Sequence, residues 1–522
     1  MYQLKKPKIY RSWTQDALSF VLHIRSASQP EDPWHPLKGL DPESLSGSSS
    51  QAYATTEVLE KHHAQYPGVS KSKVLRKIDI RLVPVLCALY LLAFLDRVNI
   101  GNAALFNLRQ DLKLGGNEYN TALVIFFVPY VLFEVPSNLL LKRFKPHVWL
   151  PACLFMFGLV TVLQGFTQNY SGILVTRFFL GLFESGMLPG CYYLISMWYK
   201  RSEAQTRYTF LFSSCSLAGA FGGLLASAIG KMDGIRGYHG WRWVFILEGL
   251  LSCVMSISFY FLISDFPEEA KWLTAEEKAF VHARLQEDVG DSGINEKMTA
   301  GRIFRALKNY KTVLGGFMYF GFIVPAYSFV YFSPSIIQTL GHSSIRTQLL
   351  SVPPYACAFV VGMIVAALSD HYAHRFLFII FSACVAIAGF AILFVEHHNS
   401  NLQYGALFLA ATGTYCGMPI ILCWFSMNVR GHIHRAVATG WQIGFGNIGG
   451  IIASYAFLAK DAPEYRSGYS ICISFVCLSA LASFLYFIGL TVENRRQVGS
   501  KGEEGKVEGG GSEKDDVFVY LR

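Results

Sequence analysis

Charged residues are scarce in this sequence. Asp, Glu, Lys and Arg make up 16% of its 522 residues, whereas 52% are hydrophobic and the mean hydropathy is +0.33. A soluble domain of ordinary composition has about 25% charged residues. The shortage of charge therefore excludes an ordinary soluble protein, and it predicts a chain that crosses a lipid bilayer many times.

Groups typical of catalytic and metal sites are missing as well. The 11 cysteines fall inside apolar runs, and none forms a metal-ligand spacing with histidine. None of the 14 histidines lies near the middle of a run, which argues against proton coupling through histidine. We find no nucleophile constellation and no phosphate-binding loop. No enzyme activity, cofactor or metal is expected, and the basic residues sit in particular loops rather than in a nucleic-acid-binding surface.

Twelve apolar runs follow the polar N-terminal region, and each has about the 20 residues that a helix needs to cross the bilayer core. Lys and Arg gather in the loops on one side of these runs, which the positive-inside rule assigns to the cytoplasm. The sequence therefore predicts an all-α membrane protein with both tails inside the cell. The runs lie at 82–104, 118–140, 148–168, 171–194, 206–229, 241–263, 313–338, 346–368, 376–395, 403–426, 435–458 and 469–491.

An internal repeat divides the twelve spans into two six-helix bundles. Gly222-Gly-Leu-Leu-Ala-Ser227 in the fifth span recurs as Gly449-Gly-Ile-Ile-Ala-Ser454 in the eleventh. A capping-box pattern, Thr274 to Glu277, predicts an amphipathic helix in the central linker that braces the two halves. The expected segments are a disordered cytoplasmic tail at 1–70, a bundle at 71–263, a cytoplasmic linker at 264–312, a second bundle at 313–491 and a disordered cytoplasmic tail at 492–522.

Ionised groups inside the spans are the main functional signal. Arg177 and Glu184 lie in the fourth span, seven residues apart, so they share one helix face at about 10 Å along the axis. Each charge at membrane depth costs roughly 2.5 to 3.5 kcal/mol, so such groups usually face protein or water and serve a function. Asp96, at the outer end of the first span, is expected to meet Arg177 across the bundle. A static pair that locks two helices is the alternative.

The second half carries no Asp, Glu, Lys or Arg well inside a span, so its candidate site groups are neutral. Asn447 has small neighbours, which leave room around a polar group. Glu134, near the inner end of the second span, is expected to fix the inner gate with Lys142 and Arg143. Asn169 begins a glycosylation sequon on the outer side. The candidates for substrate contact are Tyr130, Tyr327, Gln442 and Asn447.

These groups suggest a mechanism based on competition for Arg177. In the empty site, ionised Glu184 or Asp96 neutralises Arg177. When protons bind to the carboxylates, Arg177 is freed to accept the carboxylate of an incoming solute. A proton and an anion would then load together, and the two bundles would rock about the site.

Several strings resemble the anion:cation symporter family of the major facilitator superfamily, and above all its fungal branch of allantoate, nicotinate and pantothenate permeases. These strings are LDRVNIGNA at 95–103, FNLRQDLKL at 106–114, PSNLLLKRFKP at 136–146, GWRWVFILEG at 240–249 and FPEEAKWLTAEEK at 266–278. The resemblance implies the twelve-helix major facilitator fold.

The resemblance also implies roles for individual residues. Asp96 and Glu184 would be the proton-coupling carboxylates, Arg97 and Arg177 the anion-binding groups, and Tyr130 and Asn447 substrate contacts. The superfamily's charged loop motif is not intact here. After the eighth span only Asp370 and Arg375 are recognisable, and they are further candidates for the inner gate.

The expected function is proton-coupled uptake of a small organic anion, such as a vitamin-like carboxylate, by a monomer in the plasma membrane. Two alternatives stay open. The same carboxylates suit an exporter of an acidic secondary metabolite, and a nutrient sensor would bind a solute without transporting it.

Overall fold

The computed structural model describes residues 69–289, 301, 305, 307–372, 374–429 and 432–504. Residues 1–68 of the predicted tail at 1–70, and residues 505–522 of the predicted tail at 492–522, lie outside this part of the chain. So do the side chains of Lys142 and Arg143. Within the described residues the chain is almost entirely helical and contains no strand.

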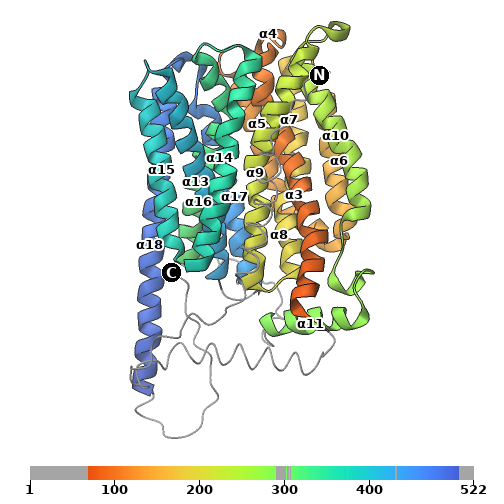
Figure 1. Cartoon of the computed structure of the whole chain (residues 1–522), viewed down its shortest axis with the longest axis vertical. Coiled ribbons are helices and arrows are strands. Elements are labelled where there is room, and N and C mark those ends of the chain that lie inside the picture. Colours follow the sequence, from red (N-terminus) through yellow and green to blue (C-terminus); the bar gives the residue numbers. More distant parts are fainter. Residues whose placement is uncertain are drawn as a thin grey trace, which may run out of the picture. The chain divides into compact units, whose positions relative to one another are not determined.

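The first half contains six helical spans, of which the fourth is divided into two helices. Figure 1 shows these helices as one group, with their axes roughly parallel, beside the helices of the second half. The short α4 (Leu108–Asp111) follows the first span. The spans are α3 (Lys71–Ala103), α5 (Glu118–Arg143), α6 (Pro146–Gln164), α7 (Tyr170–Glu184) with α8 (Met187–Trp198), α9 (Arg201–Ile229) and α10 (Gly240–Leu262).

The second half adds six more helices at the predicted places. By length and composition, ten of the spans in the described part of the chain can cross a membrane, and α5 and α17 complete the predicted set. The last helix continues to Glu504, beyond the predicted end of the span at 491. These helices are α13 (Tyr310–Thr339), α14 (Ser344–Tyr372), α15 (Arg375–Val395), α16 (Ser400–Met427), α17 (His432–Ala456) and α18 (Arg466–Glu504).

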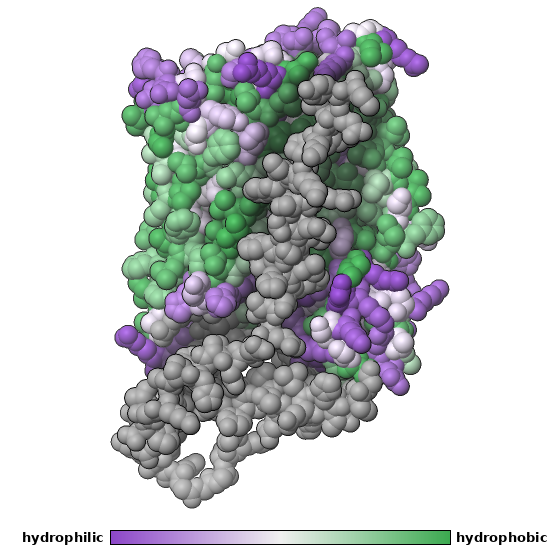
Figure 2. Space-filling model, viewed as in Figure 1, coloured by the Kyte–Doolittle hydropathy of each residue, from purple (hydrophilic) through white to green (hydrophobic). Residues whose placement is uncertain are grey.

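The outer surface has the pattern of a membrane protein. On the face that Figure 2 shows, a hydrophobic band lies between hydrophilic residues at the two ends of the helices. Large apolar side chains of the spans, such as Phe261, Leu377 and Val395, are 60–78% exposed. Such exposure is unfavourable in water but suits contact with lipid chains.

The predicted fourth span is not one continuous helix. It breaks at Ser185 and Gly186, directly after Glu184. Pro189 lacks the N–H that would bond to the Ser185 carbonyl in a continuous helix, so the ladder is interrupted there. A Cβ atom at Gly186 would lie 1.9 Å from Ser137 Oγ of α5, so a larger residue there would require the Ser137 side chain to move. The break places Glu184 at the end of α7.

The repeated glycines occupy equivalent contacts in the two halves. The first glycine of each pair faces the first helix of its own half: Gly222 faces α3, and Gly449 faces α13. The second glycine faces the second helix of the opposite half: Gly223 faces α14, and Gly450 faces Phe127 of α5. Small residues let membrane helices approach closely. The repeat in the sequence therefore marks two related contacts between the bundles.

The linker contains the predicted helix, α11 (Ala275–Val289), and its capping box forms. Thr274 Oγ1 accepts from the Glu277 N–H at 3.2 Å, and Glu277 Oε2 accepts from the Thr274 N–H at 3.0 Å. Ion pairs from Lys77 to Glu277 and from Arg284 to Glu203 fasten this helix to α3 and α9. These contacts anchor the linker on the first bundle. The expected brace to the second bundle stays a prediction.

The close approach of α5 and α7 gives a test of this packing. A Cβ atom at Gly181 of α7 would lie 2.0 Å from the backbone oxygen of Phe126, so Gly181→Ala must push the two helices apart. We expect a destabilisation of about 1 to 3 kcal/mol, seen as a lower midpoint of thermal unfolding in detergent. Gly405→Ala, where a Cβ atom meets nothing within 4 Å, is the matched control and should not lower the midpoint. Equal midpoints for the two variants would contradict this account.

Candidate functional site

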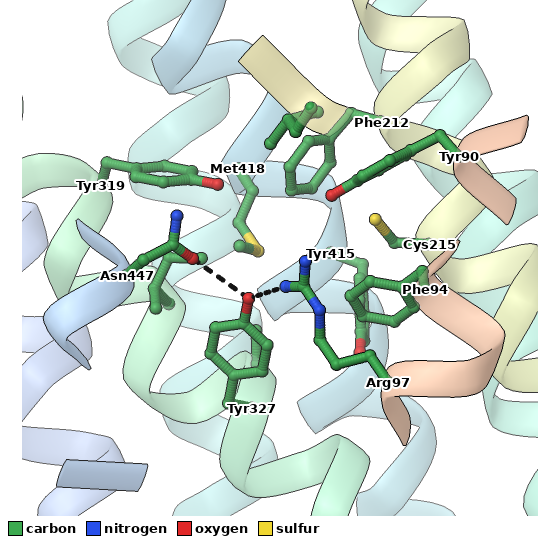
Figure 3. A pocket seen from close by; sticks show the side chains of 13 residues that line it. Tyr90, Phe94, Arg97, Phe212, Cys215, Tyr319, Tyr327, Tyr415, Met418 and Asn447 are labelled. Atoms are coloured by element: carbon green, nitrogen blue, oxygen red, sulfur yellow. Dashed lines mark hydrogen bonds between the residues drawn. The ribbon is translucent and has the colours of Figure 1, made fainter. Parts of the chain in front are cut away.

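A small cavity lies between the two bundles, near the middle of the spans. Its volume is about 20 Å³, enough for a water molecule but not for an organic solute. Figure 3 shows aromatic rings on most sides of it, with one guanidinium group and one amide among them. The aromatic lining residues are Tyr90, Phe94, Phe212, Tyr319, Tyr327 and Tyr415, and the polar ones are Arg97 and Asn447.

Arg97 connects the two halves through this cavity. Its guanidinium forms an ion pair with Glu184 of α7 and donates to the hydroxyl of Tyr327 on α13. The Tyr327 hydroxyl in turn donates to Asn447 Oδ1 on α17 at 3.1 Å, as the dashed lines in Figure 3 show. A continuous polar chain thus runs from Glu184 in the first bundle to Asn447 in the second.

Aromatic rings surround the same guanidinium. The distances from Arg97 Cζ to the ring centroids are 5.0 Å for Tyr130, 5.2 Å for Phe126, 5.5 Å for Phe94 and 5.7 Å for Tyr327. Each lies within the range of a cation–π interaction. Tyr130 therefore contacts the predicted anion-binding group, although it is not among the residues that line the cavity. The rings also keep water away from Arg97, which is 1% exposed.

Arg177 is not paired as the sequence analysis expected. Its Nη1 donates to the backbone carbonyl of Arg97 at 3.2 Å, and its Nε and Nη2 have no hydrogen-bond partner within the described residues. Glu184 contacts Arg97 instead, because the side chains of α3 and α7 converge at the end of α7. Arg177 does not line the cavity. Its contact with Arg97 is the hydrogen bond to the backbone carbonyl of that residue.

Asp96 turns away from the cavity, toward α10. Ser252 donates to its Oδ2 at 2.6 Å, and Asn99 lies 3.4 Å from its Oδ1. The Asn99 amide also donates to Glu248 Oε2 at 2.6 Å. The expected contact between Asp96 and Arg177 is thus replaced by a buried group on α3 and α10. Consecutive residues of one helix point about 100° apart, so Asp96 and Arg97 face different neighbours.

Glu134 lies at the contact between α5 and α17. A Cβ atom at Gly444 would be 3.2 Å from its Oε2, and neither carboxylate oxygen has a hydrogen-bond partner in the described structure. Gln442, a predicted substrate contact, donates to the Gly315 carbonyl at 3.1 Å and joins α17 to α13 away from the cavity. Its position explains helix packing rather than solute binding.

The other predicted groups lie near the ends of the spans. Arg375 Nη2 is 3.3 Å from Asp370 Oδ1, and Thr206 of α9 is 3.4 Å from the other oxygen of that carboxylate. This contact connects the two halves at the end of the spans that is predicted to be cytoplasmic. At the opposite end of the spans, Asn169 Oδ1 caps α7 by accepting from the Gly172 N–H at 2.8 Å.

Several residues of the site carry little or no signal in the sequence. Tyr90, Phe212, Cys215 and Met418 line the cavity, but nothing in the pattern of their spans distinguishes a cavity side chain from a packed one. For Asn99 and Ser252 the sequence contains a weak indication of their role, because both are polar residues inside a span. Polar side chains inside a span need partners in the same bundle, and these two lie on helices that carry buried carboxylates.

Hydrogen bonds join the two bundles at the end of the spans that is predicted to face outside. They connect the first turn of α5 with the last turn of α17, and α14 with α3. The pairs are Asn120 Nδ2 to the Ser454 carbonyl at 2.5 Å, Thr121 to Tyr455 at 3.0 Å, and Gln348 Nε2 to the Asn102 carbonyl at 3.1 Å.

Known structures share this arrangement of helices. A bacterial homolog of the human lysosomal transporter Spinster, in its inward-facing and unoccupied conformation, matches with a TM-score of 0.58 at 15% identity. The match covers 80% of this chain and 97% of that protein. At this identity, the similarity establishes the fold.

Sequence comparisons identify the family. The Major Facilitator Superfamily model matches residues 86–454. The MFS-type transporter cnsO of Penicillium expansum is 34% identical over 83% of this chain and 86% of its own length. The high-affinity nicotinic acid transporter of Saccharomyces cerevisiae is 31% identical, over 80% of this chain and 78% of its own length. The chain therefore belongs to the major facilitator superfamily of membrane transporters.

Proposed function

We propose that this transporter takes up a small organic anion together with protons, by alternating access. The observation that carries the proposal is the buried ion pair between Arg97 and Glu184 beside the cavity between the bundles. A guanidinium group provides planar, bidentate recognition of a carboxylate. Its partner Glu184 occupies the place that the carboxylate of a solute would take.

Protonation of Glu184 is the proposed coupling step. A proton on Glu184 removes the negative charge that neutralises Arg97. A buried guanidinium without a counterion is unfavourable by several kcal/mol, so an incoming anion is then bound more strongly. When Glu184 loses the proton, it competes with the anion for Arg97 and favours its release. Anion and proton therefore load and leave together. This scheme retains the predicted competition but moves it from Arg177 to Arg97.

The walls of the cavity favour a planar, aromatic carboxylate. Six aromatic side chains line the cavity, and stacking on such rings suits a flat ring system. Asn447 lies across the cavity from Arg97. Its amide accepts from Tyr327 and donates to the Ile443 carbonyl, so it would bind a second polar group of the solute by exchanging one of these bonds. One relative of this chain is a nicotinic acid transporter, and nicotinate is a molecule of this class.

Alternating access requires the cavity to enlarge. Its volume of about 20 Å³ admits no such anion, so the bundles must separate at one end to load it. The hydrogen bonds at the outer end, such as Asn120 to Ser454, would break when the site opens outward. Tyr327 and Asn447 join Arg97 to α13 and α17. Binding of an anion at Arg97 would therefore change the contacts of the second bundle. We propose that the protein acts as a monomer in the plasma membrane.

Anion recognition can be tested at Arg97. We expect Arg97→Ala to weaken nicotinate binding by the purified protein about 30-fold or more, since truncating one partner of a buried charge pair costs about 2 kcal/mol or more. Nicotinamide, which lacks the carboxylate, should bind no better to the wild type than to this variant. Arg466→Ala is the control, because Arg466 is exposed and pairs with Glu464 outside the site.

Arg177→Ala separates the two arginines. Arg177 lies outside the cavity, so its loss should weaken binding less than the loss of Arg97. If Arg177→Ala abolished binding and Arg97→Ala retained it, the assignment of Arg97 would be wrong. A panel of other aromatic and aliphatic carboxylates extends the test, because binding of any of them through Arg97 supports the anion site.

A further prediction concerns coupling. We expect Glu184→Gln, which imitates the protonated carboxyl, to abolish accumulation driven by an inward proton gradient in vesicles while counterflow exchange continues. Glu464→Gln, at an exposed ion pair, should behave as the wild type. Full gradient-driven uptake by Glu184→Gln would remove Glu184 from the coupling step. With the wild-type protein, efflux in exchange for protons would identify an exporter, and binding without flux would identify a sensor.

A further inference from the structure

Two phenol groups face the cavity almost without hydrogen-bond partners. Tyr90 of α3 is 2% exposed and Tyr319 of α13 is 1% exposed, and both line the cavity. In the part of the chain that the structure describes, the Tyr319 hydroxyl forms no hydrogen bond, and the Tyr90 hydroxyl has at most the thiol of Cys215 as a partner. A thiol is a weak hydrogen-bonding group. Buried hydroxyls in this state are unfavourable, so the two phenols indicate a ligand.

The helices that carry these tyrosines run beside each other in the same direction. Arg97 of α3 donates to Tyr327 of α13. Four residues later on each helix, Gly101 faces Tyr331, since a Cβ atom at Gly101 would lie 3.0 Å from the Tyr331 backbone oxygen. Residues that precede these contacts by similar numbers of positions therefore lie at similar depth on the two helices.

Tyr90 and Tyr319 lie about two turns before the contact between Arg97 and Tyr327. Tyr90 precedes Arg97 by seven residues, and Tyr319 precedes Tyr327 by eight. Each pair therefore shares one helix face, with about 10 to 12 Å between its members along the axis. Figure 3 shows the two phenols entering the cavity from opposite sides, with their hydroxyl ends toward each other. The cavity thus has a charged end and a phenolic end.

Packing holds both rings in place. A Cβ atom at Gly446 of α17 would lie 2.2 Å from Cδ1 of Tyr319, so this glycine leaves the space that the Tyr319 ring occupies. The Tyr90 ring lies against Phe94, one turn further along α3, with the ring centroids 6.4 Å apart. Side chains that are already fixed lose little conformational freedom when they bind a ligand, which favours affinity.

We propose that the hydroxyls of Tyr90 and Tyr319 bind the end of the solute opposite its carboxylate and select solutes with a hydrogen-bond acceptor at that end. This inference rests on the proposed function, because it takes Arg97 as the group that binds the carboxylate. A phenol donates one hydrogen, so a ring nitrogen, a carbonyl or a hydroxyl group would be bound. A plain hydrocarbon ring would leave both buried hydroxyls without a partner, and such sites discriminate against the ligand that lacks the polar atom.

Four aromatic carboxylates test this selection. Benzoate has no ring nitrogen, and picolinate, nicotinate and isonicotinate carry the nitrogen at increasing distance from the carboxylate. Near neutral pH this nitrogen is an unprotonated acceptor. We expect nicotinate or isonicotinate to bind the purified protein in lipid nanodiscs about tenfold more tightly than benzoate, the difference that one hydrogen bond of ordinary strength makes. Picolinate, with its nitrogen beside the carboxylate, should bind like benzoate.

Removal of the hydroxyls should abolish the preference and keep the carboxylate site. We expect Tyr90→Phe and Tyr319→Phe each to lower the ratio of pyridine carboxylate affinity to benzoate affinity, and the double variant to bring it close to one. Benzoate affinity should change less than about twofold, which also shows that each variant is folded. Tyr469→Phe is the control, because Tyr469 is similarly buried and its ring packs on Phe457 outside the cavity.

Other outcomes overturn the inference. Equal affinity of the wild type for all four carboxylates would do so and would leave the carboxylate site at Arg97 standing. A preference that survives in the double variant would assign the ring nitrogen to another group. Loss of benzoate affinity in both tyrosine variants would make the phenols part of the carboxylate site. If none of the four carboxylates binds, the proposed uptake of an aromatic carboxylate fails as well, so the two failures are distinguishable.

Discussion

The position of Arg97 is the constraint on which the rest of the structure depends. A guanidinium group that is 1% exposed in the middle of a membrane protein requires a counterion and hydrogen-bond acceptors. Glu184 supplies the charge, Tyr327 accepts a hydrogen bond, and four aromatic rings cover the remaining surface. These partners come from both bundles, so any movement of one bundle against the other must rearrange the contacts of this one group.

The helices bring these partners together through small residues and a helix break. Gly181 lets α7 approach α5 to within contact of the backbone, and Gly186 with Pro189 ends α7 just after Glu184. The repeated glycine pairs do the same at the two contacts between the bundles. This arrangement also explains why the two halves contribute different kinds of side chain to the cavity. The first bundle provides every ionised group near the cavity, and the second provides tyrosines and an amide.

Much of the architecture was predictable, for reasons that lie in the bilayer itself. Hydrocarbon satisfies no backbone polar group, so an apolar run of about 20 residues must be a helix, and the twelve runs are helices at the predicted places. The buried charges were predictable as well, because they are rare inside spans. Arg97, Tyr327 and Asn447 were named and lie at the cavity. Gln442 was also predicted as a substrate contact because it is polar inside a span, but it joins α17 to α13 away from the cavity. A polar side chain inside a span needs a hydrogen-bond partner, and the sequence does not show whether that partner is a solute or another helix.

The sequence by itself determined that this protein is a helical membrane transporter of two related bundles, with its membrane-embedded charges in the first. Only the tertiary structure decided which charges meet. Glu184 pairs with Arg97 rather than Arg177, and Asp96 joins Glu248 through Asn99 rather than facing the cavity. The physical reason is that a side chain's neighbours depend on the rotation of each helix about its axis, where one residue shifts the direction by about 100°. That rotation is set by close packing between helices, which no single segment of sequence contains.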